Sequence, residues 1–362
     1  MSGVALQAYL RQAAFYFTGY LLAVPISGAL AISKVKRIIK GERRPPLAIQ
    51  ASDASARDFV PGLHHSWLVA NGIRLHTVRA GPSTSTPPKP VMVFIHGFPE
   101  AWFSWRHQLE HFKQEYDVVA FDMRGYNESD KPLGIDSYLM RLLVSDVVTI
   151  IKSVSPDRQV TLVAHDWGGV IAWVLARAHP ELLSHLVVLC APHPSNFLEK
   201  MTTAQMLKSW YIFFFQVPWI PEAVLSDDNF VFIQKMFTSR KMGLRNRDRI
   251  SPEEIARYKV AASRPGALTS MINYYRALYR YDPRYPKPKK GKLKVPTLLM
   301  WAEDDGAFTP KVFEDTEAHV EDLTTIGLSD CSHWAQQDRP DLVNRHITEF
   351  LASHATTLGS RL

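Results

Sequence analysis

Three residues, in the chain order aspartate, aspartate, histidine, could together displace a leaving group and then release the product. Asp166 lies in the stretch VAHDWGG (163–169), where an apolar run ends and a helix-like segment begins. A nucleophile on such a strand-to-helix turn needs small neighbours, which the alanine and glycines of this stretch supply. Asp305, at the end of TLLMWAEDD, and His333, in LSDCSHWAQQDRP, could then form an acid–histidine pair. Asp166 alone could equally cap a helix, so the prediction rests on all three residues and their order.

An aspartate nucleophile restricts the reaction to attack at a saturated carbon. A serine would form a stable ether there, whereas Asp166 would form an ester that water can cleave. His333, oriented by Asp305, is the predicted base that activates this water. The backbone N–H groups of Phe98 and Trp167 are the predicted donors to the resulting oxyanion.

The elements that must position these residues are short apolar runs alternating with helix-like segments. The runs cover 90–97, 117–125, 159–166, 182–192, 295–305 and 321–330; the clearest helical segments are 136–154, 169–178 and 340–353. This alternation predicts an α/β fold with a mostly parallel sheet covered by helices on both faces. Ligands bind at the carboxyl ends of strands in such sheets. Glu303 and Asp304 follow the same strand as Asp305 and remain alternatives for the acid.

The N-terminal region predicts a membrane helix. Residues 13–32 contain no charge, and 20 such residues match the length of a helix that crosses a bilayer. Of the formal charge of +7, +6 falls within residues 1–44, mostly in the cluster at 34–44. The positive-inside rule keeps such a cluster on the cytosolic side. We therefore expect a single-pass membrane protein of the endoplasmic reticulum with a cytosolic catalytic domain.

The rest of the chain divides into a linker, a core and an insertion. We expect a membrane anchor with its basic flank at 1–44, a linker at 45–62, and an α/β core formed by 63–192 and 291–362. Asn71-Gly72, between two apolar runs, predicts a tight β-hairpin at the start of the core. Residues 193–290 are rich in aromatic residues and methionine and show no series of strands, which predicts a helical cap, or lid, over the sheet.

Composition excludes several other functions. The body after residue 44 has a net charge of only +1, which argues against nucleic-acid binding. Two cysteines, Cys190 and Cys331, provide neither a disulfide framework nor metal-ligand spacing. The expected chemistry needs only a small-molecule substrate and water, so no cofactor and no metal are expected.

These motifs resemble those of epoxide hydrolases of the α/β-hydrolase fold, over roughly residues 65–353. The family's HGxP loop corresponds to HGFP (96–99), its RGYxxSxxP segment to RGYNESDKP (124–132), and its GHDWGG turn to AHDWGG (164–169), with alanine in the first position. The resemblance favours Asp305 as the acid, since it lies five residues before a proline. It also implies a substrate pocket that includes His96, Pro99 and Trp334.

The same resemblance identifies the groups that would activate an epoxide oxygen. Epoxide hydrolases use two lid tyrosines, whose neutral phenols donate hydrogen bonds. Tyr211 lies four residues before Phe215-Gln216, and Tyr275 occupies the tyrosine of the N-[WY]-Y-R pattern, with Tyr274 as the adjacent alternative. The expected substrate is a lipophilic epoxide, such as a fatty-acid epoxide, that is converted to a vicinal diol.

Two alternatives stay open at this stage. A haloalkane dehalogenase shares the Asp-Trp turn, but it holds the departing halide with N–H donors, and Phe98 after His96-Gly97 supplies no such side chain. A non-catalytic, membrane-bound member of the fold would have no need of the complete set of five residues.

Overall fold

The computed structural model describes residues 60–80, 88–278 and 291–359, together with Pro25, Gly28, 280–282 and Arg284. The predicted membrane helix at 13–32 therefore lies outside the described residues, except for two of its positions. Within the described ranges, no helix combines the length and the apolar character needed to span a bilayer.

The centre of the fold is one eight-stranded sheet with the order β1-β2-β4-β3-β5-β6-β7-β8. Its strands are β1 (Leu63–Ala70), β2 (Ile73–Ala80), β3 (Val91–Ile95), β4 (Asp117–Phe121), β5 (Val160–His165), β6 (Leu183–Leu189), β7 (Thr297–Ala302) and β8 (Leu323–Leu328). The strands from β3 to β8 run parallel, and β1 and β2 are antiparallel additions at one edge. The predicted mostly parallel sheet is thus confirmed, and every residue of β3, β4 and β5 is buried, as expected of strands covered on both faces.

The hairpin of β1 and β2 confirms the prediction from Asn71-Gly72. Ala70 pairs with Ile73, so Asn71 and Gly72 alone form the turn, and both have positive φ values, 52° and 78°. A two-residue turn with positive φ at both positions is the geometry that Asn-Gly favours.

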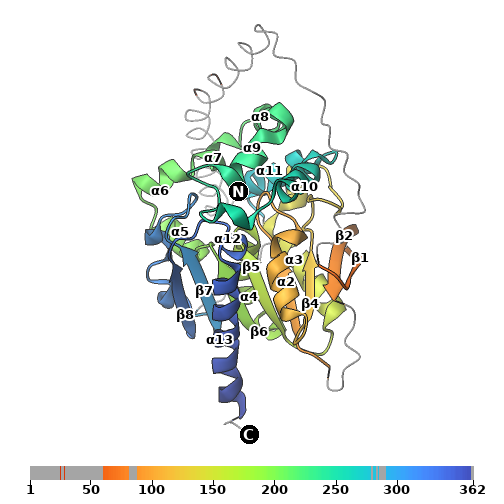
Figure 1. The fold of residues 1–362 in the computed structure, drawn as a ribbon, viewed down its shortest axis with the longest axis vertical. Coiled ribbons are helices and arrows are strands. Elements are labelled where there is room, and N and C mark those ends of the chain that lie inside the picture. The colour runs from red at the N-terminus through yellow and green to blue at the C-terminus, as the bar shows by residue number, and fades with distance from the viewer. Residues whose placement is uncertain are drawn as a thin grey trace.

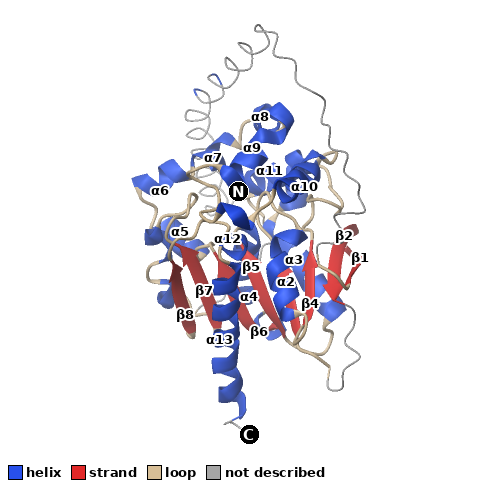
Figure 2. Ribbon diagram, in the orientation of Figure 1, coloured by secondary structure: helices blue, strands red, loops and turns tan. Residues whose placement is uncertain are grey.

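Helices cover both faces of the sheet (Figure 2). α3 (Met140–Val154) packs against α4 (Trp167–Ala178), whereas α2 (Arg106–Phe112) packs against α13 (Pro340–Gly359) and the short α12 (Ala335–Asp338). The predicted helix at 136–154 begins later than expected, at Met140, because a separate 3₁₀ turn (Ile135–Tyr138) precedes it and Leu139 has an extended ψ of 139°.

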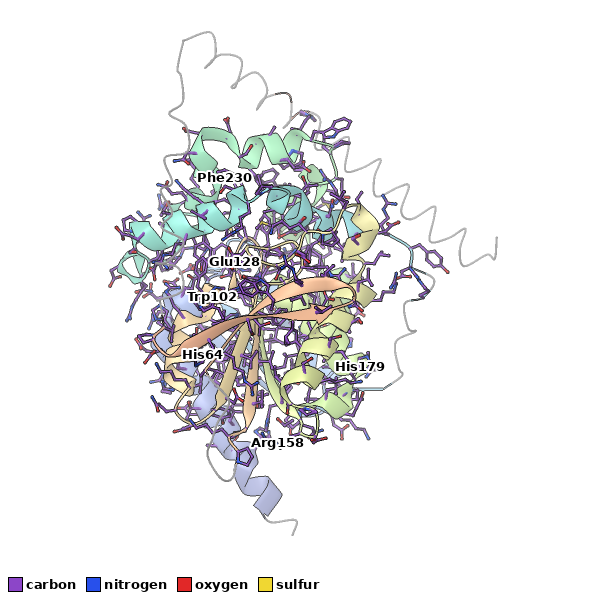
Figure 3. All side chains as sticks on the ribbon, turned by 90° about the vertical axis from the view of Figure 1, so that its right-hand side faces the viewer. His64, Trp102, Glu128, Arg158, His179 and Phe230 are labelled. Carbon is purple, nitrogen blue, oxygen red and sulfur yellow. The ribbon has the colours of Figure 1, made fainter. Side chains whose placement is uncertain are left out.

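In the described part of the chain, seven α-helices lie between β6 and β7 and form a layer above the carboxyl ends of the parallel strands (Figure 1). They are α5 (Pro194–Glu199), α6 (Thr203–Lys208), α7 (Trp210–Phe214), α8 (Ile220–Leu225), α9 (Asp227–Thr238), α10 (Pro252–Ser263) and α11 (Ala267–Ala277). Viewed from the hairpin side, Phe230 marks this cap, while Arg158 and His179 mark the opposite end of the sheet (Figure 3). The cap therefore covers the end of the sheet at which Asp166, Asp305 and His333 leave their strands.

Candidate active site

Asp166 occupies a strained turn between β5 and α4. Its φ of 49° and ψ of −118° lie outside the regions that side-chain-bearing residues prefer. The turn is also tightly enclosed: a Cβ on Gly97 would lie 2.5 Å from the Cβ of Asp166, and one on Gly168 would lie 2.4 Å from the carbonyl oxygen of Ile95. Only glycine fits at these two positions, and the enclosure holds the carboxylate at the strand end.

The Asp166 carboxylate is held by one backbone donor and faces one histidine. The N–H of Phe98 donates to Oδ1 at 2.8 Å, and Nε2 of His333 lies 3.5 Å from Oδ2. Burial alone would raise the pKa of Asp166, but His333, His165 and the Phe98 N–H outweigh it and lower the pKa below its ordinary value. Asp166 is therefore an anion at neutral pH, as a nucleophile must be.

The backbone N–H of Trp167 was the second predicted oxyanion donor. In the described part of the chain it makes no hydrogen bond to the Asp166 carboxylate. A tetrahedral intermediate would move the oxygen out of the carboxylate plane, and donors in resting sites often align only at that stage. The role of Trp167 therefore stays a prediction about the intermediate.

His333 and Asp305 form a buried pair. Nδ1 of His333 lies 2.8 Å from Oδ2 of Asp305, and the backbone N–H groups of Ala307 and Phe308 donate to the other carboxylate oxygen at 2.6 and 2.9 Å. The alternative acid Asp304 is exposed and forms an ion pair with Arg245. Glu303, the other alternative, is also exposed. The structure thus brings Asp305, and neither neighbour, to the histidine.

The two carboxylates determine the charge of His333. Burial would lower the pKa of its imidazole, but the negative charges and hydrogen bonds of Asp305 and Asp166 raise it to about 10. His333 is therefore protonated at neutral pH when the cavity holds no ligand. It can become a base only when one of the two carboxylates loses its charge.

Asp166 opens into a cavity of about 300 Å³ between the sheet and the cap. Tyr211 of α7 and Tyr275 of α11 both line it, and their rings meet edge to face with centroids 5.8 Å apart. Tyr274 does not line the cavity: its hydroxyl donates to the backbone carbonyl of Arg124 at 2.8 Å. The remaining lining is largely apolar and includes Val170, Phe197, Leu198, Ile212, Leu278 and Phe308.

Three predicted pocket residues do not line this cavity. His96 is fully buried, and its Nε2 accepts a hydrogen bond from the backbone N–H of Met123. The indole of Trp334 is also buried and donates to the carbonyls of Met236 and Met242 in the cap. Pro99 is buried as well. The prediction of these three residues as pocket lining was therefore wrong, because their side chains pack into the core and the cap and do not reach the cavity.

A buried network beneath the site was missed by the sequence analysis. Glu100 accepts hydrogen bonds from the amides of Gln336 and Gln337 at 2.8 and 2.9 Å and from the backbone N–H of Gly97. It also faces Nδ1 of His165 at 2.8 Å, while Nε2 of His165 lies 2.8 Å from the carbonyl oxygen of His333. The only signal in the sequence was adjacency, since Glu100 follows the HGFP loop and His165 precedes Asp166.

His165, Cys190 and His333 could in principle hold a metal ion, since their ligand atoms lie within 4.8 Å of one another. Both histidines, however, already make hydrogen bonds to neighbouring groups. Burial also raises the pKa of the Cys190 thiol well above its ordinary value, so the thiolate that a metal requires is disfavoured. We assign no metal to this cluster.

Comparison with known proteins gives concordant matches. Residues 90–340 match the family model described as alpha/beta hydrolase fold. Human epoxide hydrolase 4 is 41% identical over 285 residues, covering 78% of this chain and 76% of that protein. Epoxide hydrolase 2 of Caenorhabditis elegans is 37% identical over 290 residues, covering 80% of both chains.

Among solved structures, one match is a mutant of a Bacillus megaterium epoxide hydrolase complexed with its product, a naphthyloxy-propane-1,2-diol. It superimposes with a TM-score of 0.70 at 28% identity and covers 79% of this chain and all of that one.

Proposed function

This chain belongs to the epoxide hydrolases of the α/β-hydrolase fold, and from that premise we propose that it converts lipophilic epoxides to vicinal diols through a covalent ester on Asp166. The single observation that carries this proposal is one cavity lined by the Asp166 carboxylate together with the phenols of Tyr211 and Tyr275. The reaction needs a nucleophile for the ring carbon and a proton donor for the ring oxygen, and the cavity contains both.

In the first step, an Asp166 oxygen bonds to an epoxide carbon as the carbon–oxygen bond of the ring breaks. The ring oxygen leaves as an alkoxide, still attached to the other carbon, and takes a proton from a tyrosine. Burial and the nearby Asp166 charge raise the pKa of Tyr275 well above its ordinary value, which keeps the phenol protonated and able to donate. A dehalogenase would have no use for these two phenols.

In the second step, water attacks the ester carbonyl carbon of Asp166 while His333 takes a proton from that water. The Phe98 N–H, already bonded to Oδ1, would stabilise the oxyanion. Collapse of the intermediate breaks the bond between the carbonyl carbon and the substrate oxygen. That oxygen takes the proton from His333, and the diol is released. The second proton of the water, left on the Asp166 carboxyl group, then passes to His333 and restores the Asp166 anion beside a protonated His333. The tyrosinate of the first step recovers its proton from the one that His333 gives up when the ester forms.

Oxygen-18 water tests the ester route directly. With excess protein and a lipid epoxide in labelled water, we expect the first turnover to place the label in the Asp166 side chain and none in the diol. The water oxygen adds to the carbonyl carbon and stays in the regenerated carboxylate, whereas the diol retains an old carboxylate oxygen. Mass spectrometry of the Asp166 peptide and of the diol measures both. Label in the first-turnover diol would indicate direct attack of water and contradict the proposal.

The pH dependence of the two steps should differ. Formation of the ester removes the negative charge of Asp166, which helps to raise the pKa of His333 to about 10 in the free enzyme. The pKa of His333 in the ester is therefore lower than in the free enzyme. We expect the hydrolysis rate to fall as the pH is lowered from about 9 to about 5, as His333 becomes protonated.

Ester formation should persist over the same interval, because the lowered pKa of Asp166 keeps it ionised. The ester should consequently accumulate at the acidic end, which a single-turnover series across this range measures. A hydrolysis rate that does not change over the interval would contradict the assignment of His333 as the base.

Tyr275 and Tyr274 form a matched pair for testing the proton donor. Tyr275→Phe should slow ester formation by about 10²-fold, the lower range of effects for a general acid, with Tyr211 accounting for the residual rate. Tyr274→Phe removes a hydroxyl bonded to the Arg124 carbonyl. It should cost about 1 to 3 kcal/mol of stability and leave the rate of ester formation nearly unchanged. Rapid-quench kinetics and thermal unfolding of both variants distinguish the two roles. If Tyr274→Phe slowed ester formation and Tyr275→Phe did not, Tyr274 would be the proton donor.

The class of substrate follows from the cavity. Its apolar lining of aliphatic and aromatic side chains suits a hydrocarbon chain or an aromatic group attached to the epoxide. The 1,2-diol product of the Bacillus megaterium enzyme carries such an aromatic group. With the membrane anchor expected at 13–32, a substrate that partitions from the bilayer, such as a fatty-acid epoxide, is the class that we propose.

A further inference from the structure

Cap helix α6 attaches to the core in an unusual way. Gln205 is its only buried residue, whereas Met206 and Leu207 of the same helix are exposed. Burial of an amide costs free energy unless each of its groups is hydrogen-bonded, and exposure of two large apolar side chains provides no compensation. Polar contacts made by Gln205, and not apolar packing, must therefore hold α6 against the core.

The contacts of Gln205 converge on the loop that follows Asp305. Its Nε2 donates to the carbonyl of Ala307 at 2.9 Å and to Oγ of Ser209 at 3.0 Å. Its Oε1 accepts from the backbone N–H of Thr309 at 2.8 Å and from the Thr309 hydroxyl at 3.1 Å. Both ends of the amide are thus fully used, and three of the four bonds go to the loop.

Lys208, one turn further along α6, completes this attachment. Its ammonium group donates to the carbonyls of Asp305 and Phe308. The Asp305 carboxylate, in turn, accepts from the N–H groups of Ala307 and Phe308. The same two residues therefore point their N–H groups at the Asp305 carboxylate and their carbonyls at α6.

We propose that Gln205 and Lys208 are positioning residues for the hydrolysis step, holding the 305–309 loop so that Asp305 keeps His333 aligned. This inference rests on the proposed function, because it concerns the second half of the same reaction. Ester formation needs Asp166 and the tyrosines of α7 and α11, whereas the hydrogen bonds of these two side chains go to Ser209 and to the 305–309 loop. The proton transfer from water to His333 is the step that depends directly on Asp305.

Two isosteric variants test the proposal in the full-length protein. Gln205→Met keeps the length of the side chain but removes its four hydrogen bonds, and Lys208→Met removes the ammonium group. Gln216→Met is the matched control: Gln216 is also a buried cap glutamine, but its amide donates to the carbonyls of Ile212 and Tyr275, away from the 305–309 loop. Rapid quench with mass spectrometry of the Asp166 peptide gives the rates of ester formation and hydrolysis separately.

For Gln205→Met and Lys208→Met we expect ester formation within about twofold of the unmodified protein and hydrolysis slower by about 10-fold or more, since a misplaced catalytic group can cost up to about 10². Lys208→Arg, which can still donate to both carbonyls, should restore most of the hydrolysis rate. The control Gln216→Met should show the opposite pattern: the rate of ester formation falls, because Gln216 bonds to the carbonyl of Tyr275, and the rate of hydrolysis does not.

An unchanged rate of ester hydrolysis in the methionine variants, or an equal loss of rate in ester formation and hydrolysis, would overturn the inference. If Gln205→Met does not fold, the Lys208 variants decide by the same criterion. Failure of the proposed function would look different: no ester would form on Asp166 in the unmodified protein or in any variant. An ester that forms and is hydrolysed normally in both methionine variants would refute only the role of α6.

Discussion

The His333→Gln variant is expected to form the ester on Asp166 and to retain it. Its turnover should fall by about 10³- to 10⁴-fold, because glutamine cannot accept the proton of the attacking water. Ester formation should continue, since it needs the Asp166 anion and the phenols that line the cavity. Mass spectrometry of the protein after incubation with an epoxide should find the mass of the substrate on the Asp166 peptide.

The loss of the His333 imidazolium has a second effect that the experiment must take into account. His333 lowers the pKa of Asp166, so its removal raises that pKa and narrows the pH range in which Asp166 is ionised. Measurement at about pH 8 avoids this complication. A folded His333→Gln protein that binds substrate but carries no added mass would argue strongly against the covalent route.

Asp166→Ala should abolish both turnover and covalent capture, with a loss of about 10⁴-fold or more, because no other described carboxylate lines the cavity. Alanine at a φ of 49° also brings a backbone strain of about 1 to 2 kcal/mol. Asp166→Asn separates chemistry from strain, because asparagine adopts positive φ more readily. Both variants should be inactive, and retention of diol formation by either folded variant would show that the nucleophile is a different group.

The fold was predictable because its signals are local. Apolar runs bounded by polar segments marked β3 to β8, and Asn71-Gly72 marked the hairpin turn. Such patterns report directly which segments are buried on both faces of a sheet. The N-terminal apolar segment remains a prediction from length and charge alone.

The choice between adjacent residues came from the motif resemblance, because composition and periodicity alone do not separate them. Asp304 and Asp305 leave the same strand end, yet one is exposed beside Arg245 and the other is buried against His333. Which of them turns inward depends on the backbone path after β7, and composition does not encode that path. Tyr274 and Tyr275 differ in the same way, since consecutive residues on a helix point about 100° apart.

Long-range polar contacts were equally out of reach. Glu100 and His165 are 65 residues apart in sequence, and Gln205 lies 102 residues from Ala307. A buried glutamine or glutamate in a sequence resembles any exposed one, and only the completed fold shows what satisfies it.

The order of strands also determines when this enzyme can first work during its own synthesis. Asp166 follows β5, near the middle of the sheet, but His333 follows β8, the edge strand formed last along the chain. β8 can pair only with β7, and β7 is made after all the helices of the cap. A nascent chain therefore contains Asp166 long before His333, and non-local pairings of this kind are slow to form. The proposed set of Asp166, Asp305 and His333 is therefore complete only once β8 has paired with β7.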